Sequence, residues 1–251
     1  GMPPSPVRSD TYFVTGMVEA GVSHSLALKT DGTVLAWGDN TEGQVGDGTL
    51  TPRPAPVPVP GLANVRAISA GRNHTLALLA NGTVVAWGDN SQGQLGNGTT
   101  NDSPVPVPVV DLTDVIAISA GGHSLAIKAD GTLWAWGSSA SGQLGTGPVQ
   151  SPFRETRPVE VSALHGVAAI AAGPDFSLAV ATDGAESGSV WAFGANGYGQ
   201  LGSGTGGSNV PIFALAGARD VAAGDSHALA FRPHATVMAW GRNDQGQLGI
   251  G

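Results

Sequence analysis

The chain of 251 residues carries 19 acidic and 11 basic side chains, giving a net charge of -8, and it contains no cysteine. This charge balance repels phosphate backbones and argues against nucleic acid as a partner, while the lack of cysteine excludes disulfides and thiolate metal sites. No run approaches the roughly 18 apolar residues of a membrane helix and no targeting segment is recognised, so we expect a soluble protein, cytoplasmic or secreted, without a membrane span.

One pattern of short motifs recurs five times along the chain. In the second unit it runs from Gly71 through His74 and the Asn-Gly pair at Gly82 to Trp87 and then Gln94. The first glycine of each unit returns about every fifty residues, at Gly21, Gly71, Gly121, Gly173 and Gly224. A period near fifty indicates an array of one structural unit. We therefore predict a single repeat domain over residues 1–251.

The strand signals follow one order within each unit. A strand of small residues comes first, as at 67–70, and ends at the glycine of the Ala-Gly pair. The second strand, 25–29 in the first unit, leads into Asp31 and Gly32, a hairpin signal in which both turn residues are expected at positive φ. The third strand ends at a Trp-Gly pair. A proline-rich fourth strand, 54–60, belongs at a sheet edge because proline cannot donate to a ladder.

Four such strands predict a wedge-shaped antiparallel blade, with the small first strand innermost. The second strand is apolar on both faces, as expected for a sheet packed between two neighbours. The sequence therefore predicts an all-β fold, a β-propeller of about five four-stranded antiparallel blades. The fifth unit supplies only three strand signals, and we expect residues 3–8, which contain Pro3, Pro4 and Pro6, to add its fourth strand and close the ring. A closed ring predicts a monomer.

The combined run Ala-Gly-x-x-His-Ser-Leu-Ala-Leu, Asp-Gly, Trp-Gly and Gly-Gln-Leu-Gly resembles the regulator of chromosome condensation repeat family, whose members form β-propellers. The resemblance covers all five units. Family propellers usually have seven blades, so a five-bladed ring and part of a longer array both stay open. The resemblance implies several partner classes, namely small-GTPase exchange, chromatin binding and inhibition of secreted enzymes. None carries over by residue, since the acidic balance weakens chromatin binding and no long inserted wedge suited to exchange is present.

Histidine occupies the same position in four units, and phenylalanine takes it in the fourth: His24, His74, His123, Phe176 and His227. Histidines converging on an axis could bind a metal, but a position that tolerates phenylalanine favours a packing residue whose imidazole bonds a neighbouring turn. The periodic glutamines, such as Gln44, are expected to satisfy backbone groups in their loop. The periodic tryptophans, such as Trp37, are expected in the core between blades.

No arrangement of residues supports catalysis. Glu19 is a lone carboxylate on the innermost strand, where other units carry Ser69, Ser119, Ala171 and Ala222. It faces a water-filled channel or makes a specific polar contact, and no second acid or nucleophile accompanies it in the pattern. We expect no enzymatic activity, no metal and no cofactor.

Two loops vary between units while the rest repeats. They precede the histidine and follow the Trp-Gly pair, and the strand order places both on one propeller face, as expected for a binding surface on a fixed scaffold. The candidate partner-binding residues are Glu42, Arg72, Asn73, Asp89, Tyr198, Asp225, Arg242 and Asp244. Acidic neighbours predict another protein with a basic surface as the partner. A carbohydrate-binding, lectin-like propeller is the alternative, and neutral drift of solvated loops also explains the variation.

Overall fold

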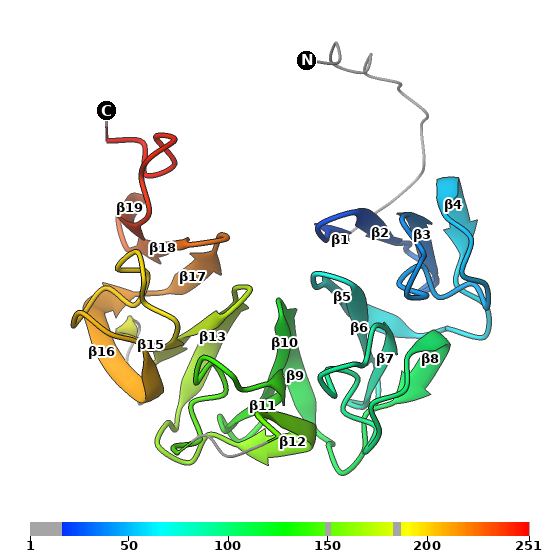
Figure 1. Ribbon diagram of the computed structural model, residues 1–251, viewed down its shortest axis with the longest axis horizontal. Coiled ribbons are helices and arrows are strands. Elements are labelled where there is room, and N and C mark those ends of the chain that lie inside the picture. Colours follow the sequence, from blue (N-terminus) through cyan, green and yellow to red (C-terminus); the bar gives the residue numbers. More distant parts are fainter. Residues whose placement is uncertain (1–16, 149–151, 183–186, 251) are drawn as a thin grey trace.

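The computed structural model describes residues 17–148, 152–182 and 187–250 (Figure 1). The regular structure there consists of β-strands, and no helix in these ranges is long and apolar enough to cross a membrane. The strands in chain order are β1 (Met17–Ala20), β2 (His24–Leu28), β3 (Val34–Gly38), β4 (Arg53–Pro58), β5 (Val65–Ala70), β6 (His74–Leu79), β7 (Val84–Gly88), β8 (Ser103–Pro108), β9 (Val115–Ala120), β10 (His123–Lys128), β11 (Leu133–Ser138), β12 (Arg154–Glu160), β13 (Val167–Ala172), β14 (Phe176–Ala181), β15 (Gly188–Gly194), β16 (Ser208–Ala218), β17 (Asp220–Ala223), β18 (His227–Arg232) and β19 (Thr236–Gly241).

These strands form five antiparallel sheets, each made of consecutive strands. Four sheets have four strands and the last, β17-β18-β19, has three. The proline-containing strands β4, β8, β12 and β16 lie at sheet edges, as predicted. The first strands of neighbouring sheets contact one another, as β5 does with β1 and β9, and they line the inner side of an arc (Figure 1). The predicted blades and their innermost strand are confirmed.

Ring closure is the part of the prediction that stays open. Residues 3–8, expected to complete the last blade, lie outside the described residues. Within the described ranges the five sheets follow an open arc, with the first and last sheets at its two ends (Figure 1).

The hairpin turns differ from the expected type. Gly32 has φ of 76°, whereas Asp31 is not among the residues at positive φ. The Lys29 amide donates to the Thr33 carbonyl at 2.9 Å and the Gly32 amide to Lys29 at 3.0 Å, so the loop has three residues rather than two. Such loops need positive φ at one residue only. Asp31 instead accepts a hydrogen bond from the Thr33 amide at 3.0 Å, which fixes the turn through its side chain.

The core lies between the sheets. One face of the first sheet, with Leu26 and Val34, belongs to the same buried cluster as Ile68 and Trp87 of the second sheet. Equivalent clusters fill the following interfaces. Each fully buried large apolar side chain contributes about 1.5–3 kcal/mol relative to an exposed one. The predicted placement of the tryptophans is confirmed for Trp87 and Trp136, which are completely buried, whereas Trp37 and Trp240 are half-buried.

Candidate functional site

Two variable loops of each unit meet at one end of its sheet. The Asp39 amide donates to the Ser23 carbonyl at 2.9 Å, and Asp89 makes the same bond to Asn73. Equivalent bonds of 2.8 to 2.9 Å join the two loops in the fourth and fifth units. We call the surface formed by these loops the loop face, and the opposite surface, formed by the Asp-Gly and Asn-Gly turns, the turn face. All eight candidate residues lie in loops of the loop face.

The structure gathers the candidates into two groups. In the first, Arg72, Asn73 and Asp89 line one cavity of about 240 Å³, together with Asp175 from the fourth unit. The Arg72 amide donates to the Gly121 carbonyl at 2.9 Å, so this loop is tied to the third sheet. Residues about a hundred positions apart in the sequence thus face one hollow.

Glu42 adds negative charge beside this group. Burial raises its pKa, and Asp102, Asp89 and Asp39 raise it further because their charges oppose its ionisation. Asp102 itself accepts a hydrogen bond from the Asn90 amide at 2.7 Å. The charges of three carboxylates therefore act on Glu42 at the ends of the first two sheets, and together the four acids favour cationic groups at this part of the loop face.

Tyr198, Arg242 and Asp244 form the second group. The Arg242 guanidinium lies 4.9 Å from the centre of the Tyr198 ring and donates to the Asp244 carboxylate at 2.5 Å. Asp244 holds the pKa of Arg242 above its usual value, and Arg242 in turn lowers the pKa of Asp244. Tyr198 stays 55% exposed. An aromatic ring held by a cation in this way is already ordered before a partner binds.

The axial end of the first strands lies between the two groups. Ala-Gly pairs from all five sheets line a cavity of about 300 Å³, and its charged residues are Arg72 and Asp225. Asp225 also acts electrostatically on Arg242. Arg72 thus borders the first group and Asp225 the second, with the cavity between them.

The periodic histidines bind across the sheet interfaces. His24 lies 3.0 Å from the Thr75 hydroxyl, His74 lies 2.9 Å from Ser124 and His123 lies 2.6 Å from Ser177, in each case through Nε2. All three imidazoles are buried. They are packing residues, as expected, but their partner is a hydroxyl on the next sheet rather than a neighbouring turn. Each Nε2 is therefore engaged away from the axis.

Each of these hydroxyls donates a hydrogen bond to the backbone carbonyl of a glutamine that follows the preceding sheet's third strand. The Thr75 hydroxyl donates to the Gln44 carbonyl at 3.1 Å, and Trp87 Nε1 donates to the same oxygen at 3.0 Å. Because the hydroxyl hydrogen is used there, the hydroxyl accepts from the Nε2–H of His24. The Gln44 side chain accepts the Glu42 amide at 2.9 Å, which confirms its predicted role in the loop.

Glycine precedes His24, His74 and His227 at the position over which the imidazole ring lies, whereas in the third unit Gly121 faces the backbone of Ala172 and Gly173. A Cβ added at Gly71 would come within 2.6 Å of the His74 ring, and Gly21 shows the same conflict with His24. Any larger residue would displace the imidazole from its hydroxyl partner. The spacing of the Ala-Gly-x-x-His motif thus follows from packing of the ring on the backbone.

Glu19 makes a specific polar contact. Burial raises the pKa of its carboxyl, and a hydrogen bond from the Ala70 backbone opposes this. Ser69 makes the equivalent contact one sheet later, with the Ala120 amide donating to its hydroxyl at 3.0 Å. Glu19 therefore joins two inner strands.

A further cavity, of about 460 Å³, lies beside the third unit's loop, between residues 142–148 and β12. In the first unit the corresponding loop is closed by Asn40, whose amide donates to the Thr49 and Thr51 carbonyls at 2.9 and 3.1 Å. Asparagines make comparable bonds in the second and fourth units. Ser139 takes this position in the third unit and has no side-chain amide, so it cannot make these two bonds.

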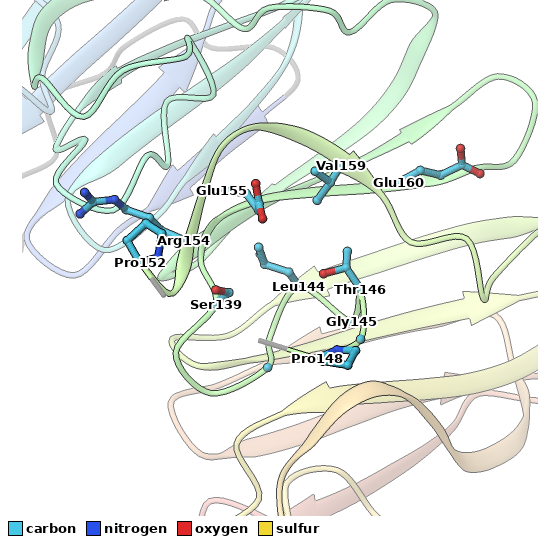
Figure 2. Close-up of a pocket in the computed structure, with 12 residues that line it drawn as sticks. Ser139, Leu144, Gly145, Thr146, Pro148, Pro152, Arg154, Glu155, Val159 and Glu160 are labelled. Carbon is cyan, nitrogen blue, oxygen red and sulfur yellow. The ribbon is translucent and has the colours of Figure 1, made fainter. Parts of the chain in front are cut away.

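The polar groups around this cavity do not converge. Figure 2 shows Arg154 turned away from it and Glu160 at its far end, while Glu155 points toward Leu144. Arg154 instead donates to the Ser91 carbonyl at 3.3 Å. We assign no ligand to this cavity.

Sequence reasoning expected Asp39 among the acidic neighbours of the loop face but missed Asp102. Asp102 lies just before β8 rather than in a variable loop, so its position in the motif gave no signal. The cavity was also missed, although the replacement of asparagine by Ser139 at one repeat position was visible. Trp87 and Trp136 expose no ring face to a sugar, so the lectin-like alternative keeps only the half-buried Trp37 and Trp240 among the periodic tryptophans.

Comparison with known proteins places these features in context. The family model for the RCC1-like domain matches residues 3–251. The ultraviolet-B receptor UVR8 of Arabidopsis thaliana is 40% identical over 91 residues, which are 35% of this chain and 20% of the receptor. Human WBSCR16 is 27% identical with a TM-score of 0.80, covering 93% of this chain and 63% of that one. Prp20p of Saccharomyces cerevisiae is 24% identical with a TM-score of 0.79, covering 94% and 60%. The chain spans less than two thirds of each relative.

Proposed function

Because this chain belongs to the family of RCC1-like domains, we propose that it is a single-domain, non-catalytic protein-binding module that uses its loop face. Structures of two relatives point to protein partners. One concerns the binding of Prp20p to Gsp1p and histones, and the other shows yeast RCC1 with Kap60 bound. The family thus supplies the class of function, and the residues of this chain supply the surface.

The cluster of Tyr198, Arg242 and Asp244 carries the proposal. Tyrosine and arginine are the residue types that most often dominate binding energy at interfaces. Here the two are stacked at 4.9 Å, and the arginine is paired with an acid. Side chains already held in place lose less conformational freedom on binding than mobile ones. This cluster is the expected centre of the interface.

The charge of the loop face favours a basic partner. Its loops and the adjoining strand starts carry more acidic than basic side chains: Asp39, Glu42, Asp47, Asp89, Asp102, Asp175, Asp225 and Asp244 against Arg53, Arg72, Arg154 and Arg242. Complementary charge accelerates association and makes it sensitive to salt. The same charge repels the phosphates of DNA, so the proposed partner is a basic protein and not a nucleic acid.

Titration of a basic protein tests this proposal, and histones are a suitable first probe. We expect Tyr198→Ala and Arg242→Ala each to weaken binding by at least about 1 kcal/mol, or roughly fivefold in Kd, with the fold unchanged by circular dichroism. Asp31→Ala and Asp130→Ala, on the turn face, are the matched controls and should leave Kd unchanged. Losses confined to the turn-face variants would show that the opposite face binds. Binding that is insensitive to salt would contradict the proposal that the acidic loop face attracts a basic partner.

A further inference from the structure

The outer strands of the first three sheets carry residues that oppose pairing with a further strand. β4 and β8 have proline at three alternate positions each, ending with Pro58 and Pro108, and proline offers no amide hydrogen. β12 carries four charged side chains among its seven residues. Prolines and charges on an edge strand both prevent the addition of another chain. These three edges are therefore protected.

The outer strand of the fourth sheet lacks this protection. β16 has 11 residues, no charged side chain and one proline, Pro211. Val210 and Phe213 are 43 and 48% exposed, and the Phe213 ring lies edge-on to that of Trp191, with 6.1 Å between the ring centres. The strand lies on the outer side of the arc, in the fourth sheet rather than at either end (Figure 1). A long apolar edge of this kind is open to pairing.

Phe213 takes the register position that proline holds in the first two sheets. It pairs with Trp191 of β15. Pro58, Pro108 and Glu160 pair with the equivalent position of the third strand in the first three sheets. One position of the outer strand is thus proline, proline, glutamate and phenylalanine in turn. Only the phenylalanine offers both an amide hydrogen and an apolar side chain there.

The backbone of Phe213 points away from its own sheet. In an antiparallel ladder, residues alternate between exchanging both backbone hydrogen bonds with their partner and exchanging none. Pro58 is of the second kind, since the next residue, Val59, donates to the Val34 carbonyl at 3.0 Å. Phe213 has the same register, so its amide and carbonyl are directed to the open side of β16. Within the described ranges no hydrogen bond joins the Phe213 amide to a loop or to another sheet.

We propose that the outer edge of β16 binds an extended segment of a partner protein, which adds a fifth strand to the fourth sheet. The Phe213 amide donates to the backbone of this segment and the Phe213 carbonyl accepts from it, while an apolar side chain of the segment packs on Phe213 and Trp191. A strand is the structure whose backbone groups match such an edge, with main-chain bonds supplying affinity and side-chain contacts supplying specificity. This edge is separate from the loop face, so the inference does not rest on the function proposed above.

A second copy of β16 fits this edge less well than a regular segment. Pro211 lies two residues before Phe213, so the side of its backbone that lacks an amide hydrogen also faces outward. Two β16 strands paired about a two-fold axis at Phe213 would therefore each lose a donor at Pro211. The register of β16 against β15 also shifts at three places, which a second irregular strand would have to match. The occupant that suits the edge is a regular, proline-free segment of another protein.

Hydrogen exchange in the full chain tests whether the edge is open. The Phe213 amide should exchange about as fast as an unprotected amide, whereas the amides of Ile212 and Leu215, which pair with β15, should exchange slowly. Protection of the Phe213 amide in the free protein would overturn the proposal, because the edge would then already be paired.

Selection on the full chain, from a displayed library of random peptides about as long as β16, then tests the occupant. We expect peptides that bind the wild type and Phe213→Leu equally, because leucine keeps the amide and an apolar side chain. Phe213→Pro copies Pro108 and should weaken binding about tenfold or more, since it removes the outward donor and leaves a peptide carbonyl unpaired. Tyr198→Ala, on the loop face, should leave Kd unchanged. Should Phe213→Pro fail to fold by circular dichroism, Phe213→Glu, which copies Glu160, replaces it.

A bound peptide should also protect the Phe213 amide from exchange, because that amide then donates to the peptide. A selection that yields no peptide dependent on Phe213, or only peptides that bind Phe213→Pro as tightly as the wild type, would overturn the proposal. A wild-type dimer in light scattering that Phe213→Pro converts to a monomer would overturn it as well, since a second copy would then occupy the edge.

Discussion

At the scale of single residues, the buried histidines determine how the sheets are joined. Burial lowers the pKa of His24 and of His74 to about 4 and of His123 to about 3, with Asp39 and Asp89 opposing the shift at the first two. Neighbouring histidines lower the values of His74 and His123 further. The imidazoles are therefore neutral at physiological pH, with the proton on Nε2 where the hydroxyl accepts it. The Nδ1 atoms of His24 and His123 lie buried without a partner among the described residues.

These pKa values predict acid sensitivity. The unfolded chain protonates histidine near its ordinary pKa of 6.5, whereas the folded chain resists protonation until about pH 4. The contribution of these histidines to stability is therefore full above pH 6.5 and falls as the pH drops, levelling off near pH 4 for His24 and His74 and near pH 3 for His123. At about 1.4 kcal/mol per pKa unit, the full loss is at most about 3 to 4 kcal/mol for each of the first two and about 5 kcal/mol for His123. Melting temperatures measured between pH 7.5 and 4 should fall accordingly.

A double substitution isolates this contribution. His74→Phe with Ser124→Ala copies the pair Phe176 and Ala228, which lie in one buried cluster at the fourth interface. The variant lacks one buried imidazole, whereas its carboxylates are those of the wild type. It should therefore lose less stability than the wild type between pH 6.5 and 4. Equal slopes of melting temperature against pH in the two proteins would contradict the assignment.

At the scale of strands and loops, every interface keeps at least one donor on its glutamine carbonyl. At the second interface both the Ser124 hydroxyl and Trp136 Nε1 donate to the Gln94 carbonyl, at 2.8 and 2.9 Å. The third interface has Phe193 in place of tryptophan, and Ser177 alone makes this bond, at 2.7 Å. The fourth interface has Ala228 in place of the hydroxyl, and there Trp240 donates to Gln200 at 2.9 Å. The loss of the tryptophan donor, at Phe193, and the loss of the hydroxyl donor, at Ala228, thus fall on different interfaces.

This difference predicts unequal costs for one substitution at two equivalent sites. Ser124→Ala leaves the Gln94 carbonyl bonded to Trp136, whereas Ser177→Ala leaves the Gln143 carbonyl without its donor. An unsatisfied buried polar group costs about 1–3 kcal/mol. Each substitution also removes the hydroxyl partner of one histidine, His74 or His123, so this cost is common to both variants and cancels when they are compared. Urea unfolding should show Ser177→Ala to be the less stable by that amount, and equal midpoints would mean that another group or a water satisfies the carbonyl.

At the scale of the whole molecule, the interfaces couple the sheets into the single domain that we propose. Each sheet contacts its neighbours only, so stability is the sum of sheets and interfaces, as in other repeat proteins. The interfaces are extensive, with clusters of buried side chains between every consecutive pair of sheets. Their strength favours cooperative unfolding over the loss of one sheet at a time.

Thermal unfolding therefore should show one transition. Far-ultraviolet circular dichroism reports on all strands, and tryptophan fluorescence reports mainly on the buried indoles at the interfaces. We expect the two signals to change at the same temperature. Two resolved transitions would contradict a single cooperative domain.

The sequence by itself determined the repeated unit, its four strands and the packing role of its periodic residues. This was possible because these features depend on local chemistry: glycine under an imidazole, proline at a sheet edge, and apolar residues on both faces of a strand. Only the tertiary structure decided which groups fifty residues apart meet, such as His74 with Ser124 or Arg242 with Tyr198, because those contacts depend on how one sheet is set against the next. The arc that the five described sheets follow likewise depends on the angle accumulated over successive interfaces, a quantity that no single unit of the sequence contains.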